Sequence, residues 1–498
     1  MHKIFNLVYM KRQMCICKAF CAFCLGAMLY ACSGPQQQGP QPTEGQRAMM
    51  ERKYGMFLHF GMNTYLNVEW SDGTAPASTY NPPADMAEKA AGWVRNAKRA
   101  GMRSIVLTTK HHDGFCLWDS KYTDYDIAHP AIENKVDIVK AVSDACHREG
   151  IAFSVYYSLW DRHEPCYQDS DKYLYIEYMK NQLQELMTNY GTVHELWFDG
   201  AWDRKTEDWH LQEVYDFVKG MQPDCQISTN WTIGKRPVDM QEGDSIVYFP
   251  SDFRLWDPFL PVKNDPKIYT HNGKKYYLPF ESTQTISVIG SWFNHPEDTT
   301  VRDVEELEEI FYVSTSNDNC LLLNIPPATN GEQNPKAIAN IVQLAELLGI
   351  ENGKDFPKEL KKPQSKTTHA TAVASSVCKG DTLHNGAVYA VDSDVSTAWM
   401  SGDSLAWVDV TLSQQETFDR FFIIIGENSI RKFTVEVKKD AQWISVYESG
   451  VLPETRLNSF MGYGTLDFNL SEPVTTDRFR INIQQSNGSP GIYSIRLK

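Results

Sequence analysis

Between residues 47 and about 350 the chain repeats one pattern, in which a helix-like segment ends at a turn and a short apolar run follows. The first clear example places Met86, Ala90, Val94 and Ala97 at helical spacing, and the run MRSIVLTT comes directly after the glycine that ends it. Three later segments behave in the same way and lead into the runs IAFSVYYS, TVHELWFDG and CQISTN. These runs are apolar on both faces, which is typical of parallel strands buried between layers of helices.

The number of predicted strands approaches eight. The run GMFLHFG at residues 55–61 opens the series, and later candidates lie near 246–250, 277–282 and 320–325. We therefore predict an α/β fold in which residues 47–350 form a (β/α)8-like barrel, with a doubly wound open sheet as the alternative.

The pattern changes after the predicted barrel. Residues 351–368 are rich in Pro and Lys and are predicted to be a linker. From there residues 369–498 consist of short alternating runs such as LAWVDVTL, FDRFFIIIG and KFTVEVKK, separated by turn residues. This spacing predicts an all-β sandwich as a second domain.

Residues 1–31 have the layout of a secretory signal peptide. Basic residues precede the apolar stretch AFCAFCLGAMLYAC, which is too short to span a bilayer stably, and the polar segment SGPQQQGPQP follows. The end of the stretch, LYAC, resembles a bacterial lipobox and implies that Cys32 is lipidated, whereas cleavage without a lipid is the alternative. We expect residues 33–46 to be a tether and the protein to be lipid-anchored in the bacterial periplasm or outer membrane.

Charge and cysteine content exclude several classes of protein. The formal net charge of −15 leaves no basic excess to displace counterions from phosphates, which argues against nucleic acid as a partner. The chain has 11 cysteines, and those that follow Cys32 are scattered without a CxxC pair, unlike a zinc site or a disulfide-dense scaffold. The 13 Trp and 24 Tyr residues supply many flat apolar faces, which suit a core and also stacking on sugar rings.

Polar side chains gather where the predicted strands end. These positions are His59, Lys110, His111, His112, Asp113, Tyr156, Tyr157, Asp199, Asn230 and Glu281. The C-terminal ends of the strands of a (β/α)8 barrel meet on one face, where such barrels carry their active sites. We therefore expect the chemistry of this protein to reside in these side chains.

Asp199 and Glu281 are the two strand-end acids that suggest a reaction. Glycoside hydrolysis with retention needs two carboxyl groups about 5 to 5.5 Å apart, one attacking the anomeric carbon and one protonating the leaving oxygen. Apolar walls such as Trp292 and Phe293, together with a neighbouring anion, raise the pKa of the proton donor. The alternatives are structural: Asp199 can cap a helix or close a turn, and Glu281 can be a buried salt-bridge partner.

The adjacent histidines of TTKHHDG allow two interpretations. Neighbouring strand residues point to opposite sides, so His111 and His112 reach one ligand only if the chain turns, and the Asp-Gly that follows supplies such a turn. His59, His111 and Asp199 can provide a metal site, and the same histidines can equally hydrogen-bond the hydroxyls of a sugar. The residues alone leave both interpretations open.

Five motifs in order resemble glycoside hydrolase family 29, the retaining α-L-fucosidases. They are GMFLHFGMNTY, TTKHHDGFCLWDSKYTDYDI, VYYSLWD, ELWFDGAW and CLLLNIPP, within residues 47 to about 350. The resemblance implies that Asp199 is the nucleophile and that His59, His111 and His112 bind fucose hydroxyls. It implies no metal and no other cofactor for catalysis.

The same resemblance implies further substrate contacts. The tyrosine of the YYS motif falls on Tyr157, with Tyr156 as the alternative, and the EW pair falls on Glu69 and Trp70. The segment PFESTQTISVIGSWFNHPED resembles the acid/base region of the branch that prefers α-1,3/1,4-linked fucose, which puts the acid/base on Glu281. An apolar notch must select the methyl group at C6 of fucose. Its candidates are Phe57, Phe60, Trp70, Trp197 and Trp292.

The C-terminal segments AVDSDVSTAWMS and WVDVTL resemble a discoidin (F5/8 type C) domain, a jelly roll close to family 32 carbohydrate-binding modules. The resemblance implies a structural calcium ion held through Asp392 and Asp394, and the alternative is that these carboxylates only stabilise the turn. Sugar binding and a purely structural role are both open for this domain.

These observations predict a lipid-anchored, retaining exo-α-L-fucosidase that acts on fucosylated oligosaccharides or glycoconjugates. Two alternatives belong to other classes of protein. One is a glycan-binding lipoprotein whose barrel no longer turns over substrate, and the other is a metal-dependent hydrolase built on the same barrel.

Overall fold

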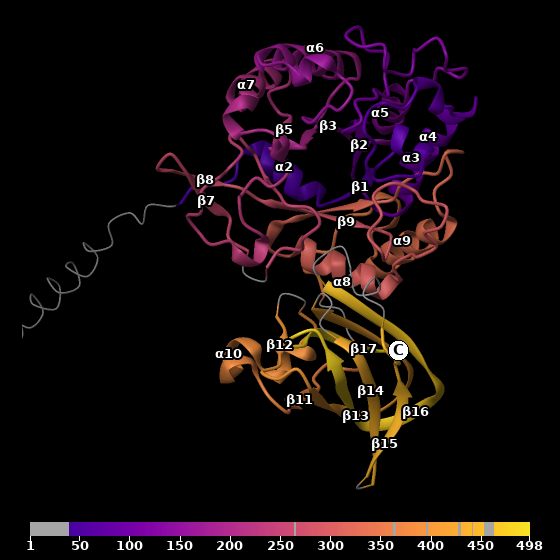
Figure 1. The fold of residues 1–498 in the computed structure, drawn as a ribbon, viewed down its shortest axis with the longest axis vertical. Coiled ribbons are helices and arrows are strands. Elements are labelled where there is room, and N and C mark those ends of the chain that lie inside the picture. Colours follow the sequence, from indigo (N-terminus) through magenta and orange to yellow (C-terminus); the bar gives the residue numbers. More distant parts are fainter. Residues whose placement is uncertain are drawn as a thin grey trace, which may run out of the picture. The chain divides into compact units, whose positions relative to one another are not determined.

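The computed structural model describes residues 39–262, 265–361, 365–394, 397–426, 430–440, 442–452 and 463–498. The predicted signal peptide and the lipidation site Cys32 lie outside the described residues. Residues Pro42–Lys498 form one compact unit, which contains the barrel and the C-terminal sheet (Figure 1). Among the described residues no helix is both long enough and apolar enough to cross a bilayer.

An eight-stranded parallel sheet makes up the N-terminal part of this unit. Its strands are β1 (Tyr54–Leu58), β2 (Ser104–Lys110), β3 (Ala152–Ser158), β4 (Glu195–Asp199), β5 (Gln226–Thr229), β6 (Arg254–Leu255), β9 (Phe280–Thr285) and β10 (Cys320–Asn324). Their order is β5-β4-β3-β2-β1-β10-β9-β6, so chain neighbours are also neighbours in the sheet for most of its width. The two edge strands, β5 and β6, lie close to each other: the hydroxyl of Ser228 in β5 donates to the carbonyl of Phe253, which directly precedes β6, at 2.6 Å. The predicted (β/α)8-like barrel is therefore confirmed.

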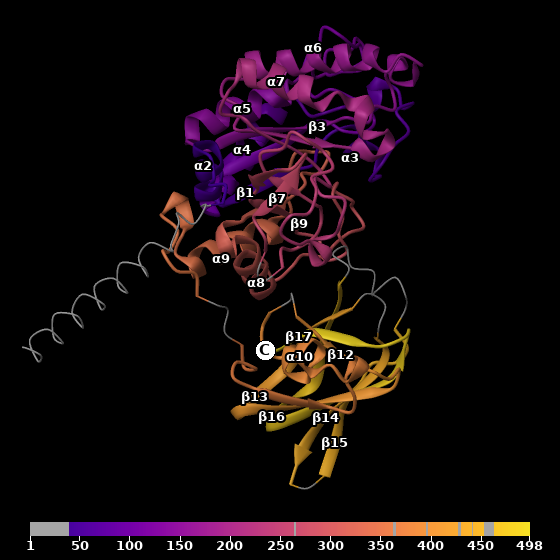
Figure 2. The same ribbon diagram turned by 90° about the vertical axis from the view of Figure 1, so that its left-hand side faces the viewer.

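The helices between these strands lie along the outside of the barrel, as Figures 1 and 2 show: α4 (Met86–Arg99), α5 (Ile138–Glu149), α6 (Tyr173–Asn189), α7 (Leu211–Met221) and α8 (Val304–Thr315). Helix α9 (Pro335–Leu348) follows the last strand, and the short α3 (Met62–Leu66) lies in the loop after β1. Helix α2 (Glu44–Arg52) precedes β1 and contributes Met49 to the apolar cluster inside the barrel. Helix α5 illustrates how local chemistry sets the ends of a helix. The Asp137 carboxylate accepts from the backbone N–H of Lys140 at its start, and Gly150 adopts the left-handed conformation at its end.

Along each strand the side chains alternate between two apolar layers. Phe57, Val106, Tyr156 and Trp197 point into the barrel and pack in one cluster. Their neighbours in sequence, such as Tyr157, pack outward in the larger cluster that the helices cover. The alternation decides which of two adjacent residues reaches the interior of the barrel.

The second half of the barrel differs in detail from the prediction. Residues 246–250 form no strand, and a proline at position 250 cannot donate to a sheet. The sixth strand is instead the two-residue β6, and the next begins only at Phe280. Between them the chain adds a hairpin of β7 (Ile268–His271) and β8 (Lys274–Tyr277).

An antiparallel sheet forms the C-terminal part of the unit, as predicted for an all-β domain. Its strands are β11 (Thr371–Ala374), β12 (Trp399–Met400), β13 (Ala406–Gly426), β14 (Ile430–Lys439), β15 (Gln442–Glu448), β16 (Tyr463–Ser486) and β17 (Gly491–Leu497). Their order is β12-β17-β13-β16-β14-β15, with β11 paired to β13, and a short helix α10 (Thr382–Asn385) precedes β12. The long strands β13 and β16 pair with two shifts of register, and such bulges bend the sheet around its buried apolar core.

The predicted calcium residues lie in a turn of this domain. The Asp392 carboxylate accepts hydrogen bonds from the backbone N–H of Asp394 at 3.0 Å and from the Thr397 hydroxyl at 2.8 Å. These bonds are those of a turn that its own carboxylate stabilises. Carboxylate and carbonyl oxygens are also the ligands that calcium takes, so a calcium ion at Asp392 and Asp394 stays a prediction.

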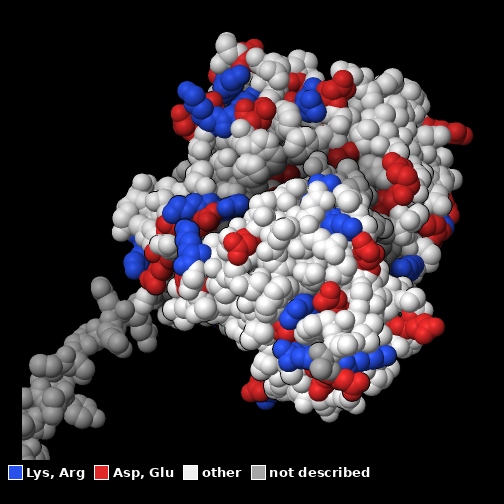
Figure 3. Space-filling model, turned by 60° about the horizontal axis from the view of Figure 1, so that its bottom comes forward, with Lys and Arg blue, Asp and Glu red and all other residues white. Residues whose placement is uncertain are grey.

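The surface carries both signs of charge. On the face drawn in Figure 3, Lys and Arg side chains lie beside Asp and Glu side chains, and wide areas carry neither. The cysteines of the described residues are all free thiols: Cys116, Cys146, Cys166, Cys225, Cys320 and Cys378. The described part of the chain is therefore stabilised by its apolar cores and not by disulfides.

Candidate active site

Asp199 is the last residue of β4 and is only 7% exposed at the C-terminal face of the barrel. Gly200 follows at φ 76°, in the left-handed region, and turns the chain sharply. A larger residue does not fit at this position, because its Cβ would lie 2.7 Å from the Cβ of Trp160. The Asp199 carboxylate accepts from the Tyr156 hydroxyl at 2.8 Å and from the Asn230 amide at 3.0 Å. Burial raises the pKa of Asp199, and the two donors oppose this shift because they favour the carboxylate.

Three histidines lie beside this carboxylate. His59 follows β1, while His111 and His112 follow β2, where the backbone N–H of Gly114 donates to the His111 carbonyl and closes the predicted turn. The ring centroid of His111 is 6.1 Å from that of His59 and 4.1 Å from that of His112. His112 Nε2 lies 3.6 Å from Asp199 Oδ2. The structure therefore brings the three predicted histidines and the strand-end acid together.

Hydrogen bonds set the tautomers of His59 and His112. His59 Nδ1 lies 2.9 Å from the side-chain oxygen of Asn324, which only accepts, so His59 donates there. Ser158 gives its single hydroxyl proton to the carbonyl of Trp160 at 2.6 Å. The Nδ1 of His112, 2.6 Å from the same hydroxyl oxygen, must then be the donor. In both rings Nε2 remains as an acceptor.

His111 has the opposite tautomer. Its Nδ1 lies 3.1 Å from the amide nitrogen of Asn63, which donates, so His111 carries its proton on Nε2. Burial lowers the pKa of His59 and of His112 to about 3, and it lowers the pKa of His111 well below its usual range. The cluster therefore consists of neutral imidazoles that offer one donor and two acceptors, a set suited to sugar hydroxyls. Among the described residues no three His, Cys, Asp or Glu side chains are arranged to hold a metal ion.

A second carboxylate, which the sequence analysis missed, lies beside Asp199. The Asn230 amide nitrogen that bonds Asp199 also donates to Asp257, and the backbone N–H of Asp257 donates to the Asn230 side-chain oxygen at 3.1 Å. Two hydrogen bonds from one nitrogen keep the two acceptor oxygens within roughly 6 Å of each other. Burial and the negative charge of Asp199 raise the pKa of Asp257 to about 7. The site thus pairs an oriented carboxylate with an acid that holds its proton near neutral pH.

Glu281 is not part of this site, so its assignment as the acid/base is wrong. It is the second residue of β9 and pairs with Cys320, the first residue of β10, at the N-terminal end of the barrel. Its neighbours are Glu195, the first residue of β4, and Arg52. The side chains of Glu195 and Arg52 form an ion pair with each other at 2.6 Å. The whole length of β4, a rise of about 13 Å, separates Glu195 from Asp199.

The wrong assignment of Glu281 and the missing prediction of Asp257 have the same origin, namely where a strand begins and ends. The run LPF before Glu281 resembles the end of an apolar strand, but the strand begins at Phe280 and continues through the buried polar residues STQT. The strand before Asp257 was not predicted because β6 has only two residues. The signal that points to this acid is LWD at 255–257, which repeats the pattern of LWFD at 196–199, an apolar run that ends on a carboxylate.

Tyr156, and not Tyr157, contributes to the site. Tyr156 points into the barrel and donates to Asp199. Tyr157 points outward, where its hydroxyl accepts from Lys110 at 2.9 Å and donates to Gln182 at 2.7 Å. Adjacent strand residues face opposite sides of a sheet, so only one of the pair can reach the substrate. The assignment to Tyr157 is therefore corrected to Tyr156.

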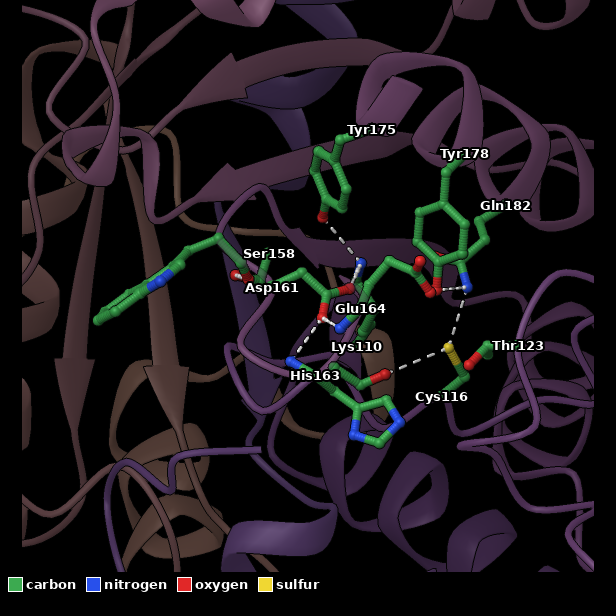
Figure 4. Close-up of polar contacts among 12 residues, drawn as sticks. Lys110, Cys116, Thr123, Ser158, Asp161, His163, Glu164, Tyr175, Tyr178 and Gln182 are labelled. Carbon is green, nitrogen blue, oxygen red and sulfur yellow. Dashed lines mark hydrogen bonds and ion pairs between the residues drawn. The ribbon is translucent and has the colours of Figure 1, made fainter. Parts of the chain in front are cut away.

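The polar layer around Lys110 holds the loop behind the site (Figure 4). Lys110 is fully buried and donates to Asp161 at 2.7 Å and to the Tyr175 hydroxyl at 3.1 Å. The other oxygen of Asp161 accepts from the backbone N–H groups of His163 and Glu164. These contacts fix the loop that follows β3, which packs against the histidine cluster.

Glu69 anchors a loop that supplies two aromatic walls. Its carboxylate lies 3.0 Å from the backbone N–H of Trp292, which donates to it, and 2.7 Å from Nε2 of His295. The ring of Trp292 then lies 5.0 Å from that of His59, and the ring of Phe293 stands nearly perpendicular to His59 at 5.4 Å. Of these predicted residues, Trp292 lines the site directly, and Glu69 fixes the loop that carries it.

The other predicted aromatic residues lie at different depths. Trp70 is 52% exposed, and its ring centroid lies 5.5 Å from that of His112 in an edge-on contact. Trp197 is buried and stacks on Tyr156 with 5.5 Å between ring centroids, so it forms the floor of the site and not its rim. Phe60 packs in the outer apolar layer and does not line the site. This position of Phe60 excludes it from the predicted notch.

The chain is similar to proteins of one family along most of its length. The family model described as Alpha-L-fucosidase matches residues 36–353, and the one described as F5/8 type C domain matches residues 371–497. Alpha-L-fucosidase 1 of Arabidopsis thaliana is 30% identical over 318 residues, which are 62% of this chain and 60% of that protein. A rice protein, described as a candidate α-L-fucosidase 1 of Oryza sativa subsp. japonica, is 28% identical over 437 residues, 84% of this chain and 80% of that protein.

A solved structure agrees over a larger part of both chains. The crystal structure of a candidate α-L-fucosidase from Bacteroides thetaiotaomicron matches with a TM-score of 0.51 and 26% identity, over 93% of this chain and 98% of that chain. The described barrel and the antiparallel sheet thus occur together in a second protein.

Proposed function

Because the chain belongs to the α-L-fucosidase family, glycoside hydrolase family 29, we propose that it is a retaining, exo-acting α-L-fucosidase. Its substrates are oligosaccharides or glycoconjugates that end in α-1,3/1,4-linked L-fucose, a preference supported by the likeness of residues 279–298 to that branch of the family. The observation that carries the proposal is the Asn230 amide, which holds Asp199 and Asp257 side by side.

The separation of the two acids supports retention. Retaining glycosidases place their carboxyl groups about 5 to 5.5 Å apart, whereas inverting enzymes separate theirs by about 6.5 to 9.5 Å to admit a water molecule. Acceptor oxygens that share one amide donor, as those of Asp199 and Asp257 do, fit the shorter class.

In the first step Asp199 attacks the anomeric carbon of fucose, and the bond from that carbon to the glycosidic oxygen breaks. Asp257 transfers its proton to the leaving oxygen, so the aglycone departs as a neutral alcohol and a fucosyl ester remains on Asp199. Below its pKa of about 7 Asp257 is mostly protonated. The hydrogen bonds from Tyr156 and Asn230 favour the ionised form of Asp199.

In the second step the roles reverse. Asp257, now a carboxylate, takes a proton from a water molecule as the water oxygen attacks the anomeric carbon. The ester bond to Asp199 breaks, fucose leaves with its original configuration, and Asp257 is again protonated.

The walls of the site support recognition of a terminal deoxy sugar. Tyr156, Trp197 and Phe57 pack on one another below Asp199, so a sugar that enters from the C-terminal face meets a closed floor. The neutral histidines offer partners for hydroxyls. Phe57 and Trp292 both contact the His59 ring and each other, and they give the apolar surface that a methyl group needs.

The proposal is tested with purified protein and fucosyl disaccharides of α-1,2, α-1,3 and α-1,4 linkage. We expect faster release from the latter two, with α-L-fucose as the first anomer in a proton NMR time course. Asp199→Ala abolishes release, and added azide restores a slow reaction that yields β-L-fucosyl azide. Release by Asp199→Ala at the wild-type rate, or β-L-fucose as the first product, contradicts the proposal.

We also propose that residues 1–31 are a signal peptide and that Cys32 carries a lipid anchor, which places the protein in the periplasm or outer membrane. The basic residues, the apolar stretch and the LYAC sequence support this. In a bacterial host, Cys32→Ser then moves the protein from the membrane to the soluble fraction and abolishes incorporation of labelled palmitate. An unchanged membrane fraction contradicts the anchor.

A further inference from the structure

Four tryptophan side chains lie in a row beside the active site. In order they are Trp70, Trp202, Trp231 and Trp256, and the centroids of successive rings are 6.5, 4.8 and 5.5 Å apart. Successive ring planes are inclined by 23°, 31° and 16°, so each ring lies roughly face to face with the next. Trp70 and Trp231 are 52% and 37% exposed, and the row therefore reaches the surface of the barrel.

Three of these tryptophans come from loops that also carry the polar groups of the site. The loop after β4 carries Trp202 three residues beyond Asp199. The loop after β5 carries Trp231 directly after the amide that joins the two carboxylates, and the loop after β6 carries Trp256 directly before Asp257. Three loops thus each deliver one polar group and one indole ring to the same place.

The backbone of Trp231 adopts a conformation that bulky residues rarely take. Its φ of 63° lies in the left-handed region, which glycine and asparagine usually occupy. Its backbone N–H donates to the side-chain oxygen of Asn230 at 3.0 Å, so the turn is held by the same amide that bonds the two acids. Strain held in place beside reacting groups is typical of functional sites.

The rings of the row overlap only in part. Aromatic rings in contact stack with their planes about 3.5 Å apart. The centroid distances of 4.8 and 5.5 Å on either side of Trp231 therefore mean that the rings are displaced sideways by roughly 3 to 4 Å. Each ring leaves part of its face uncovered, and together they form a stepped apolar wall.

We infer that Trp202, Trp231 and Trp256 form the binding surface for the sugar to which the fucose is attached. This inference rests on the proposed function, because the leaving oxygen must emerge next to Asp257. Trp256 directly precedes that acid in the chain, and the ring of Trp231 stacks on that of Trp256. A pyranose ring presents a flat patch of C–H groups that stacks on an aromatic face. The ligand is an uncharged sugar residue, since the neighbouring carboxylate of Asp199 repels an anionic one.

The test compares two kinds of leaving group. Wild type and variants are assayed with fucosyl disaccharides of α-1,2, α-1,3 and α-1,4 linkage and with α-L-fucosyl fluoride, whose single-atom leaving group cannot stack. For the disaccharides that the wild type cleaves, Trp231→Ala lowers kcat/KM about tenfold more than for the fluoride. The larger part of this loss appears in KM, and Trp231→Phe, which keeps a flat ring, recovers most of it.

A matched control removes an aromatic ring elsewhere on the surface. Tyr122 is 43% exposed and lies outside the row, so Tyr122→Ala leaves the ratio of the two kcat/KM values as in the wild type. Trp202→Ala, assayed in the same way, replaces Trp231→Ala if circular dichroism shows that the latter misfolds. Equal losses on disaccharide and fluoride overturn the inference, as does a Trp231→Phe variant no better than Trp231→Ala.

The assay also separates this inference from the proposed function. Wild-type protein that hydrolyses the fluoride but none of the disaccharides overturns the sugar-binding role of the row and the proposed linkage preference, while the double displacement at Asp199 stands. Wild-type protein that hydrolyses neither substrate overturns the proposed function itself.

Discussion

Asp199 and Glu281 lie at opposite ends of the barrel, because Asp199 is the last residue of β4 and Glu281 is the second residue of β9. Two carboxyl groups at that separation cannot act on one glycosidic bond. The acid that shares a hydrogen-bond donor with Asp199 is Asp257. Glu281 lies instead with Glu195 and Arg52 in a buried polar cluster at the N-terminal end.

Glu281→Gln is expected to leave catalysis almost unchanged. The substitution keeps the shape of the side chain and imitates the neutral form that its raised pKa favours. We predict that kcat/KM for a fucosyl disaccharide stays within about threefold of the wild-type value. A fall in kcat/KM of a hundredfold or more in steady-state kinetics would show that Glu281 takes part in catalysis.

The same substitution should change how stability depends on pH. Burial and the charge of Glu195 raise the pKa of Glu281 in the folded protein well above its ordinary value of 4.5. The folded state therefore holds this proton more tightly than the unfolded chain does, so the stability contributed by Glu281 is present at low pH and is lost as the pH rises above 4.5. Thermal unfolding of Glu281→Gln should occur above the wild-type temperature at pH 8 and near it at pH 4. Equal differences at both pH values count against this prediction.

Asp257→Ala should remove general-acid catalysis. We predict that kcat/KM for disaccharides falls about 10²- to 10⁴-fold. The loss is smaller for α-L-fucosyl fluoride, whose leaving group needs no proton. The surface variant Asp239→Ala, which removes an exposed partner of Arg236, is the control for loss of an aspartate. Equal losses of Asp257→Ala on the two substrates would exclude a proton donor at this position.

The dependence of kcat/KM on pH tests the role of Asp257 independently. Asp257 must be protonated to act, so wild-type kcat/KM for disaccharides should fall as the pH rises through about 7. For the fluoride this fall should be absent, because the first step then needs no acid. Profiles of the same shape for both substrates would assign the fall to another group.

Tyr156 and Tyr157 form a matched pair for phenylalanine substitution. Tyr156→Phe removes a donor to the carboxylate of Asp199, and we expect kcat to fall about tenfold or more, since hydrogen bonds to charged groups contribute about 1.5–3 kcal/mol. Tyr157→Phe removes a buried partner of Lys110 and Gln182, so the free energy of unfolding falls by about 1–3 kcal/mol with kcat retained. Urea unfolding and steady-state kinetics of both variants check the two effects. A fall in kcat for Tyr157→Phe and not for Tyr156→Phe would show that Tyr157, and not Tyr156, reaches the site.

Metal removal separates the catalytic barrel from the C-terminal domain. Fucose release should continue in EDTA, whereas added calcium should raise the melting temperature of the wild type and not that of Asp392→Ala. Activity that disappears in EDTA and returns with zinc would instead favour the metal-dependent hydrolase. A melting temperature that does not respond to calcium would leave Asp392 as a turn-stabilising residue only.

Local patterns were sufficient to predict the architecture and half of the site. The apolar runs before Asp199 and before His111 end abruptly on polar residues, and a strand end is visible in the sequence whenever the run is long enough. The C-terminal ends of the strands of a parallel barrel lie on one face, so the histidines and Asp199 had to meet there. The change from helix-and-strand units to alternating strands after residue 369 marked the second domain equally well.

The acid partner and the choice of tyrosine could not be predicted in the same way. A two-residue strand leaves no periodic signal before Asp257, and the start of β9 depends on its pairing with β10 and not on its own residues. Adjacent tyrosines are chemically identical in a sequence, and a shift of one residue in register exchanges their sides. Only the pairing of β3 with its neighbours turned Tyr156 toward Asp199.

The sequence by itself determined the barrel, the all-β domain, the nucleophile candidate and the histidine cluster, since these depend on the spacing of apolar residues over short stretches. The tertiary structure decided that Asp257 stands beside Asp199, that Glu281 lies at the other end, and that tryptophans from separate loops align in one row. These relationships depend on register between strands that are far apart in the chain, and register is set by packing of the whole barrel.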